Sequence, residues 1–185
     1  MLDKVFADAE KRMDQALEGV KRELSGLRTG RASVSILDGI SVDYYGSPTP
    51  LAQMCKLSTP DAGTIVAQPF DPSVIKDVEK AIKVADLGLN PSNDGKVVRI
   101  PIPPLTEERR KQLVKKVGQI VEEGKNGVRQ VRREANDEVK RLEKDGKVSE
   151  DDAHRGLERV QKLTDDHVKK LDDLGKAKDK ELMEF

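Results

Sequence analysis

Residues 107–144 read EERRKQLVKKVGQIVEEGKNGVRQVRREANDEVKRLEK, and this stretch decides the fold. Apolar or small residues recur along it about every 3.6 positions, which is the period of an α-helix. They are Leu113, Val117, Ile120, Gly124, Val128, Val131, Ala135, Val139 and Leu142. A coiled-coil repeat would have a shorter period, of about 3.5. The stretch therefore predicts a nearly straight helix with one apolar face, roughly 57 Å long at about 1.5 Å per residue.

Two other stretches carry an apolar stripe of the same period. One covers residues 2–28, and Gly30 just beyond it is predicted to cap the helix in a left-handed conformation. The other follows Ser149, which is a predicted N-cap. Helices with a single apolar face bury it against one another. The sequence therefore predicts a three-helix bundle made of residues 1–30 and 105–185.

The residues between these helices, 31–104, have a different character. Runs rich in β-branched residues predict strands at residues 34–46, 64–67 and 96–102. Between them, Asp71 followed by Pro72 predicts the start of a short helix. We expect a small inserted β/α/β domain, so the predicted fold class is α+β.

An inserted domain requires the chain to cross twice between the domain and the bundle. We predict hinges at these crossings, near residues 29–31 and 102–106. The predicted hinge residues are Thr29, Gly30, Arg31, Pro103, Pro104, Leu105 and Thr106.

Charge is unevenly distributed, although 34 basic and 34 acidic residues give a formal net charge of zero. Residues 109–141 carry eleven basic and five acidic side chains, whereas residues 145–185 carry nine and twelve. A neutral total gives no general attraction to nucleic acid, so any such attraction must come from the basic helix.

Within that helix, Lys125, Arg129 and Arg132 lie on one sector beside the apolar stripe, and Arg133 extends the sector outward. Guanidinium groups match the geometry of phosphates, which favours an RNA-binding role. The alternative is a solvated face whose cations pair with acids of the C-terminal helix. No aromatic residue lies in the basic stretch, so RNA would be bound through its backbone and shape.

No catalytic or cofactor-binding motif is present, and we predict neither an enzyme nor a metal site. The P-loop pattern is absent. His154 and His167 are expected to be surface residues, and Cys55, the only cysteine, a buried structural thiol. There is no membrane-spanning run and no signal-peptide core, so a cytoplasmic protein is expected.

Four motifs resemble signatures of the ribosome recycling factor family, and they occur in order along the chain. They are LRTGRAS at residues 27–33, YYGSPTPL at 44–51, PIPPLTEERR at 101–110 and VRQVRREA at 128–135. The resemblance covers essentially the whole chain. It implies an L-shaped molecule in which a flexible double linker joins a three-helix bundle to a β/α/β domain.

The resemblance also implies a function. Members of the family bind the post-termination ribosome, contact large-subunit ribosomal RNA through the bundle and, with elongation factor G and GTP, split the ribosome into subunits. Carried onto this chain, Arg129, Arg132 and Arg133 would contact the RNA, and Arg28 and Arg31 would assist near the elbow.

Lys125 also belongs to the predicted RNA-binding set. The resemblance further implies that the inserted domain would receive the force exerted by the GTPase, elongation factor G. We expect a monomer without a cofactor. The alternative function is a coiled-coil-like structural adaptor that binds protein helices, for which oligomers are expected instead.

Overall fold

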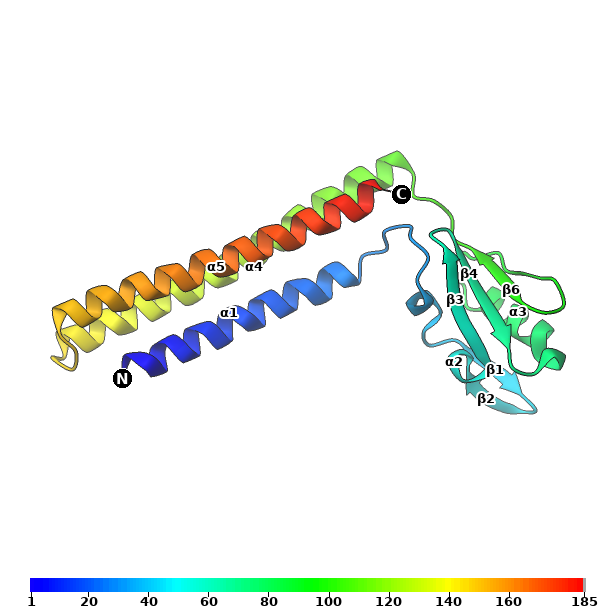
Figure 1. Cartoon of the computed structure of the whole chain (residues 1–185), viewed down its shortest axis with the longest axis horizontal. Helices are drawn as coiled ribbons and strands as arrows, with labels where there is room; N and C mark the ends of the chain where they lie inside the picture. The colour runs from blue at the N-terminus through cyan, green and yellow to red at the C-terminus, as the bar shows by residue number, and fades with distance from the viewer. Residues whose placement is uncertain (185) are drawn as a thin grey trace. The chain divides into compact units, whose positions relative to one another are not determined.

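The chain forms two compact units in a computed structural model that describes residues Met1–Glu184 (Figure 1). Unit 1 contains Met1–Arg28 and Glu107–Glu184, and unit 2 contains Thr29–Thr106. These limits lie two residues from the boundaries that the sequence pattern suggests. Unit 1 is entirely helical and unit 2 holds the sheets, so the predicted α+β class, with a helical bundle and an inserted domain, is confirmed.

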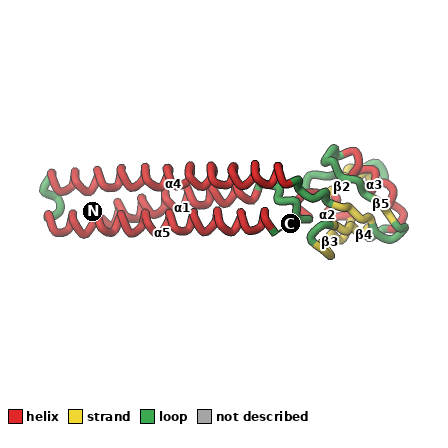
Figure 2. Tube along the Cα trace, turned by 90° about the horizontal axis from the view of Figure 1, so that it is seen from above, coloured by secondary structure: helices red, strands yellow, loops and turns green. Residues whose placement is uncertain are grey.

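Unit 1 is a bundle of α1 (Leu2–Ser25), α4 (Glu107–Lys144) and α5 (Glu150–Met183). Figure 2 shows the three helices side by side along their lengths. The apolar stripe predicted for α4 is buried along its whole length. Asp145-Gly146 ends this helix, and Ser149 caps the next by accepting a hydrogen bond from the backbone N–H of Asp152.

The prediction for the end of the first helix was wrong. The helix ends at Ser25, and its cap is Gly26 with an ordinary φ of −72°. The Ser25 hydroxyl donates to the Arg22 carbonyl, and Leu27 N–H bonds to Leu24 O, so the last turn tightens. Gly30 does have the predicted left-handed φ, of 78°, but it lies beyond the helix.

The prediction of a surface position for His167 was also wrong. Its side chain is only 3% exposed, because this position of α5 faces α1. Both ring nitrogens lie within hydrogen-bond distance of an oxygen there, with Nε2 2.8 Å from Asp14 Oδ1 and Nδ1 2.7 Å from Leu163 O. These polar contacts allow the ring to be buried at the helix interface. His154, in contrast, is exposed as expected.

Unit 2 has a four-stranded antiparallel sheet in the order β3-β4-β6-β5 and a separate β1–β2 hairpin. Their bounds are β1 Ser41–Tyr44, β2 Ser47–Pro50, β3 Cys55–Asp61, β4 Thr64–Pro69, β5 Ser92–Asn93 and β6 Val98–Pro101. Short helices complete the unit, namely η1 Val34–Leu37, α2 Leu51–Met54, η2 Pro72–Val74 and α3 Ile75–Val84. The helix start predicted at Asp71 is confirmed, because the Asp71 carboxylate accepts from the backbone N–H of Ser73.

The strand predicted over residues 34–46 is only partly correct. Its first part forms the 3-10 helix η1, because the Ser33 hydroxyl accepts the N–H of Ser35 and caps a turn there.

Unit 2 has a hydrophobic core of its own. Its fully buried members include Val42, Ile65, Val78 and Val98.

Both ends of unit 2 are tied to the same turn between β3 and β4. Ala32 N–H donates to Ala62 O at 2.7 Å, and Ile102 N–H donates to Gly63 O at 2.8 Å. The two chain segments that lead to unit 1 therefore begin from neighbouring anchor points.

Candidate nucleic-acid interface

Among the predicted RNA-binding residues, Arg129, Arg132 and Arg133 lie on α4, and Arg132 contacts α5. Arg132 is half-buried, and its Nη1 donates to Gln161 Oε1 at 3.5 Å. Gln161 in turn donates from Nε2 to Asp165 Oδ1 at 2.8 Å. This chain of contacts orients Arg132 from the neighbouring helix and leaves most of its five N–H donors available.

Arg129 and Arg133 extend this surface toward solvent. The Arg129 side chain is 40% exposed, and its Nη1 donates to Asn126 Oδ1 at 3.1 Å. Its nearest carboxylate is Glu122, 3.8 Å away. Arg133 is exposed and makes no ion pair within Met1–Glu184. We call Arg129, Arg132 and Arg133 the arginine face.

Lys125 differs from these arginines. Its side chain is 13% exposed and lies between two carboxylates, Glu122 on its own helix at 3.0 Å and Asp172 on α5. The hydrogen bonds to Asp172 and then to Glu122 raise the pKa of the ammonium group. For Lys125 the geometry therefore favours the alternative reading, in which the cation pairs with an acid of the C-terminal helix.

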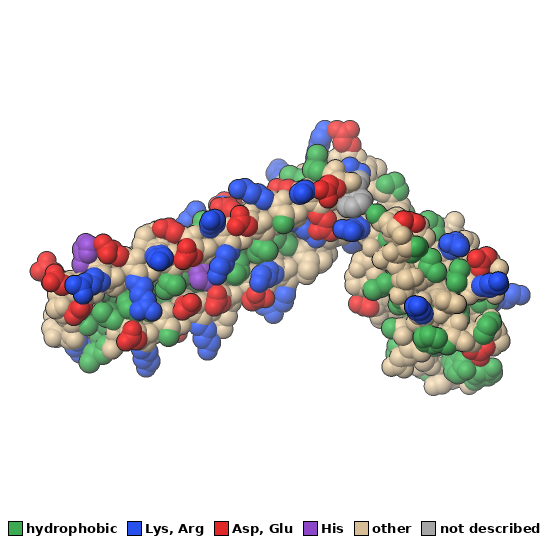
Figure 3. Space-filling view, in the orientation of Figure 1, with side chains coloured by type: hydrophobic (Ala, Val, Ile, Leu, Met, Phe, Trp, Pro, Cys, Tyr) green, Lys and Arg blue, Asp and Glu red, His purple; other side chains and the backbone are tan. Residues whose placement is uncertain are grey.

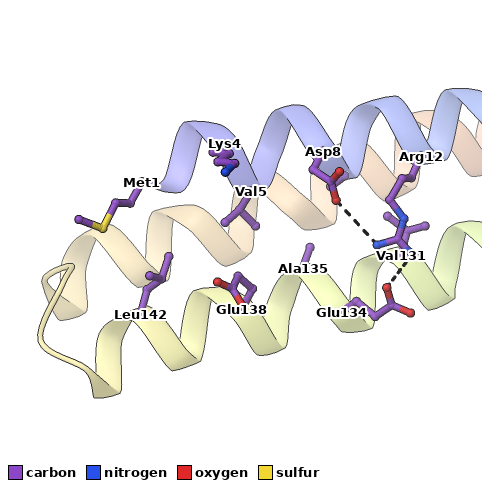
Figure 4. A pocket seen from close by; sticks show the side chains of 11 residues that line it. Met1, Lys4, Val5, Asp8, Arg12, Val131, Glu134, Ala135, Glu138 and Leu142 are labelled. Carbon is purple, nitrogen blue, oxygen red and sulfur yellow. Dashed lines mark hydrogen bonds and ion pairs between the residues drawn. The ribbon is translucent and has the colours of Figure 1, made fainter.

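The opposite side of α4 carries a different pattern of charge. A groove of about 480 Å³ lies there between α1 and α4, with Val5, Ala9 and Val131 among its lining residues (Figure 4). Arg12 bridges Glu134 at 2.6 Å and Asp8 at 3.8 Å. Hydrogen bonds from Gln130 and Arg12 hold the pKa of Glu134 below its usual value. Arg12, which lines this groove together with Lys4, is neutralised by carboxylates and is therefore poorly suited to bind a phosphate.

The remaining predicted residues belong to the segments at the unit boundary. Arg28 is exposed in unit 1, and Arg31 is exposed in unit 2. Among the predicted hinge residues, Thr29 is buried, and a Cβ placed on Gly30 would lie 3.0 Å from Leu105 Cγ. Their roles in RNA contact or hinge motion stay predictions.

The sequence did not indicate which residues hold the arginine face. Asn126 stands three positions before Arg129, a spacing that brings side chains together on a helix and that could have been recognised. Gln161 could not be found this way, because its place beside Arg132 depends on the register of α5 against α4.

Other kinds of site find little support in the described residues. No three His, Cys, Asp or Glu side chains within Met1–Glu184 are grouped so that they could hold a metal ion. In the same range, no helix combines the length and apolar character needed to cross a membrane. Cys55 is buried as predicted, and its burial raises the thiol pKa to about 11.

Comparison with known proteins gives a consistent result. The family model for "Ribosome recycling factor" matches residues 20–183. The ribosome-recycling factor of Desulfatibacillum aliphaticivorans is 54% identical over 185 residues, and the match covers 100% of this chain and 100% of that protein. That of Geobacillus sp. (strain WCH70) is 53% identical, again with complete coverage of both chains.

Two solved structures are also similar. The solution structure of a ribosome recycling factor has a TM-score of 0.72 and 44% identity, covering 100% of this chain and 98% of its own. The second has a TM-score of 0.62, 44% identity and 98% coverage of both chains. It belongs to models of the T. thermophilus ribosome recycling factor and the E. coli elongation factor G bound to the E. coli post-termination complex.

Proposed function

This chain belongs to the ribosome recycling factor family, a family of translation factors, and we propose that it recycles ribosomes after termination. It binds the post-termination ribosome through the arginine face and, with elongation factor G and GTP, separates the subunits. Its place of action is the cytoplasm, where bacterial-type ribosomes work.

The observation that carries this proposal is the way the arginine face is held. Arg132 is oriented by the amide oxygen of Gln161 and Arg129 by that of Asn126, while the carboxylate of Glu122 lies farther off, 3.8 Å from Arg129. An amide fixes the direction of a guanidinium group without cancelling its charge. Arg133 adds a third charge, which makes no ion pair within Met1–Glu184. Such a surface suits the phosphates of folded RNA, which are recognised by charge and shape.

The energy for splitting comes from the elongation factor in this proposal, since the sequence contains no nucleotide-binding loop. This chain contributes a unit that binds the ribosome and a unit that moves. Unit 1 is anchored on ribosomal RNA, and unit 2 moves as one body about the segments 29–31 and 102–106. The hydrogen bonds of Ala32 and Ile102 to the β3–β4 turn support this division, because they fix where each segment joins unit 2.

A subunit-splitting assay tests the proposal. Post-termination 70S ribosomes are mixed with this protein, elongation factor G and GTP, and light scattering follows their dissociation. Splitting is expected only when all three are present, and a non-hydrolysable GTP analogue is expected to suppress it. Ribosomes that stay intact in the complete mixture, while a known recycling factor splits them, would overturn the proposal.

A further inference from the structure

The turn of the β1–β2 hairpin has an unusual occupant. Tyr44 pairs with Ser47, so the turn itself consists of Tyr45 and Gly46. Their φ angles are 50° and 84°, and two successive positive values define a type I′ turn. Asn, Asp and Gly are favoured at the first of these positions, because Gly has no Cβ to crowd the backbone and the short polar side chains of Asn and Asp hydrogen-bond to it locally. Tyr45 therefore works against the stability of its own turn.

The same end of unit 2 exposes two large aromatic side chains. Tyr45 is 82% exposed and Phe70, which follows β4, is 70% exposed. Tyr44 connects them, since its ring packs edge-on against Tyr45 with centroids 4.7 Å apart. Its hydroxyl donates to Asp71, the neighbour of Phe70, at 3.5 Å. We call Tyr44, Tyr45 and Phe70 the aromatic tip.

The elements that carry the aromatic tip lie close to one another in unit 2. The β1–β2 turn and the end of β4 point toward the same end of the unit (Figure 1). Hydrophobic side chains gather on the surface at this end (Figure 3). Exposed aromatic side chains that lie together indicate a binding surface more strongly than scattered ones do.

The charges beside the aromatic tip indicate whether nucleic acid or protein is the better partner for it. Asp43 accepts the N–H of Gly46 at 2.8 Å, and Asp71 contacts Tyr44. Hydrogen bonds from the side chain and backbone of Ser73 hold the pKa of Asp71 below its usual value, so this carboxylate is ionised near neutral pH. Two carboxylates beside the rings repel phosphates, which disfavours the stacking of RNA bases there.

We propose that the aromatic tip docks a protein partner that offers an apolar pocket edged by Lys or Arg side chains. The proposal rests on the proposed function, which brings this chain together with elongation factor G and ribosomal proteins. Tyr45 and Phe70 enter the pocket, and Asp43 and Asp71 face its basic rim. Aromatic side chains of this kind carry much of the binding energy in protein interfaces.

Replacement of Tyr45 allows an effect on docking to be distinguished from an effect on the stability of the fold. Tyr45→Asn creates the Asn-Gly pair that a type I′ turn prefers, so the denaturation midpoint is expected to stay the same or rise. The rate of subunit splitting is expected to fall by at least about fivefold, because an anchor of the interface is lost. Val84→Asn is the matched control, since Val84 is 73% exposed in unit 2 but lies at the end of α3. It is expected to split ribosomes at the wild-type rate.

A photo-crosslinking experiment identifies the partner. p-Benzoylphenylalanine replaces Tyr45, or Val84 as control, and the full chain is irradiated with purified post-termination ribosomes, elongation factor G and a GTP analogue. Adducts with a protein component at position 45 support the proposal. Adducts with ribosomal RNA, the absence of adducts, or an unchanged splitting rate for Tyr45→Asn would each overturn it. If the wild-type chain itself fails to split ribosomes, the proposed function fails instead.

Discussion

Arg132 and Lys125 are cations of the same helix with opposite surroundings. The guanidinium of Arg132 meets the neutral amide of Gln161, whereas the ammonium of Lys125 lies between Glu122 and Asp172. An ion pair within the protein competes with an external phosphate, and an amide contact does so much less. We therefore expect Arg132 to act in binding and Lys125 to act mainly in holding α4 against α5.

Arg132→Ala is expected to weaken binding to the ribosome and to lower the slope of log affinity against log salt by about 1, as the loss of one phosphate contact does. The free energy of unfolding is expected to change little, since Arg132 is half-buried and its one hydrogen bond is long. Sedimentation of the protein with ribosomes at several salt concentrations measures both the affinity and the slope.

Arg141→Ala is the matched control for this measurement. Arg141 lies on the same helix with a side chain that is 68% exposed, and it pairs with Glu138 at 2.8 Å. The substitution removes the same charge outside the arginine face, so a slope near that of the wild type is expected. Equal slopes for both variants would show that Arg132 is not a specific contact.

At the scale of single residues, the helical period of the sequence predicts which side chains lie on the same sector of one helix. It places Arg129, Arg132 and Arg133 on one sector of α4, and in the structure Arg132 of this sector contacts Gln161 of α5. It could not reveal that Gln161 holds Arg132 or that Asp172 neutralises Lys125. Both depend on how two helices distant in sequence are aligned.

Among the elements, α4 contacts both other helices, and Gly124 makes this possible. A Cβ at this position would overlap Val20 Cγ2 of α1 and would lie 3.3 Å from Leu171 Cδ2 of α5. The absence of a side chain allows the three helices to approach one another here. Gly118 on the same helix is exposed, and a Cβ there would meet no atom within 4 Å.

Gly124→Ala is expected to lower the free energy of unfolding of unit 1 by about 1–3 kcal/mol, the range for overpacking a core. Gly118→Ala is expected to raise it by up to about 1 kcal/mol, because Ala favours the helix and nothing obstructs its methyl group. Urea denaturation followed by circular dichroism at 222 nm compares the two variants. A gain in stability from both would mean that the helices can move apart at Gly124 without penalty.

The elements differ in how well the sequence predicts them. The bounds predicted for α4 agree with the structure, because its stripe persists from Leu113 to Leu142, about eight turns, and Asp145-Gly146 interrupts it. β2 was missed because it contains two prolines, which are typical of edge strands and weaken the strand pattern. β3 was missed because most of its side chains are exposed and show little alternation.

At the scale of the whole molecule, the chain forms two hydrophobic cores, and the two segments that form the first are separated in sequence by the residues that form the second. Unit 1 closes only when α1 packs against α4 and α5, although 78 residues of unit 2 separate α1 and Arg28 from Glu107. The core of unit 2 consists of residues between Ala32 and Ile102 and needs no side chain of the bundle. Separate cores joined at two chain crossings favour separate unfolding transitions.

Two spectroscopic signals distinguish the units without any label. The chain has no Trp, and its two tyrosines, Tyr44 and Tyr45, both lie in unit 2, so tyrosine fluorescence reports on that unit. Circular dichroism at 222 nm reports mainly on the three long helices of unit 1. Gly124→Ala is therefore expected to lower the urea midpoint seen by circular dichroism and to leave the fluorescence midpoint where it is in the wild type. Equal shifts of both midpoints would show that the two cores unfold as one cooperative unit.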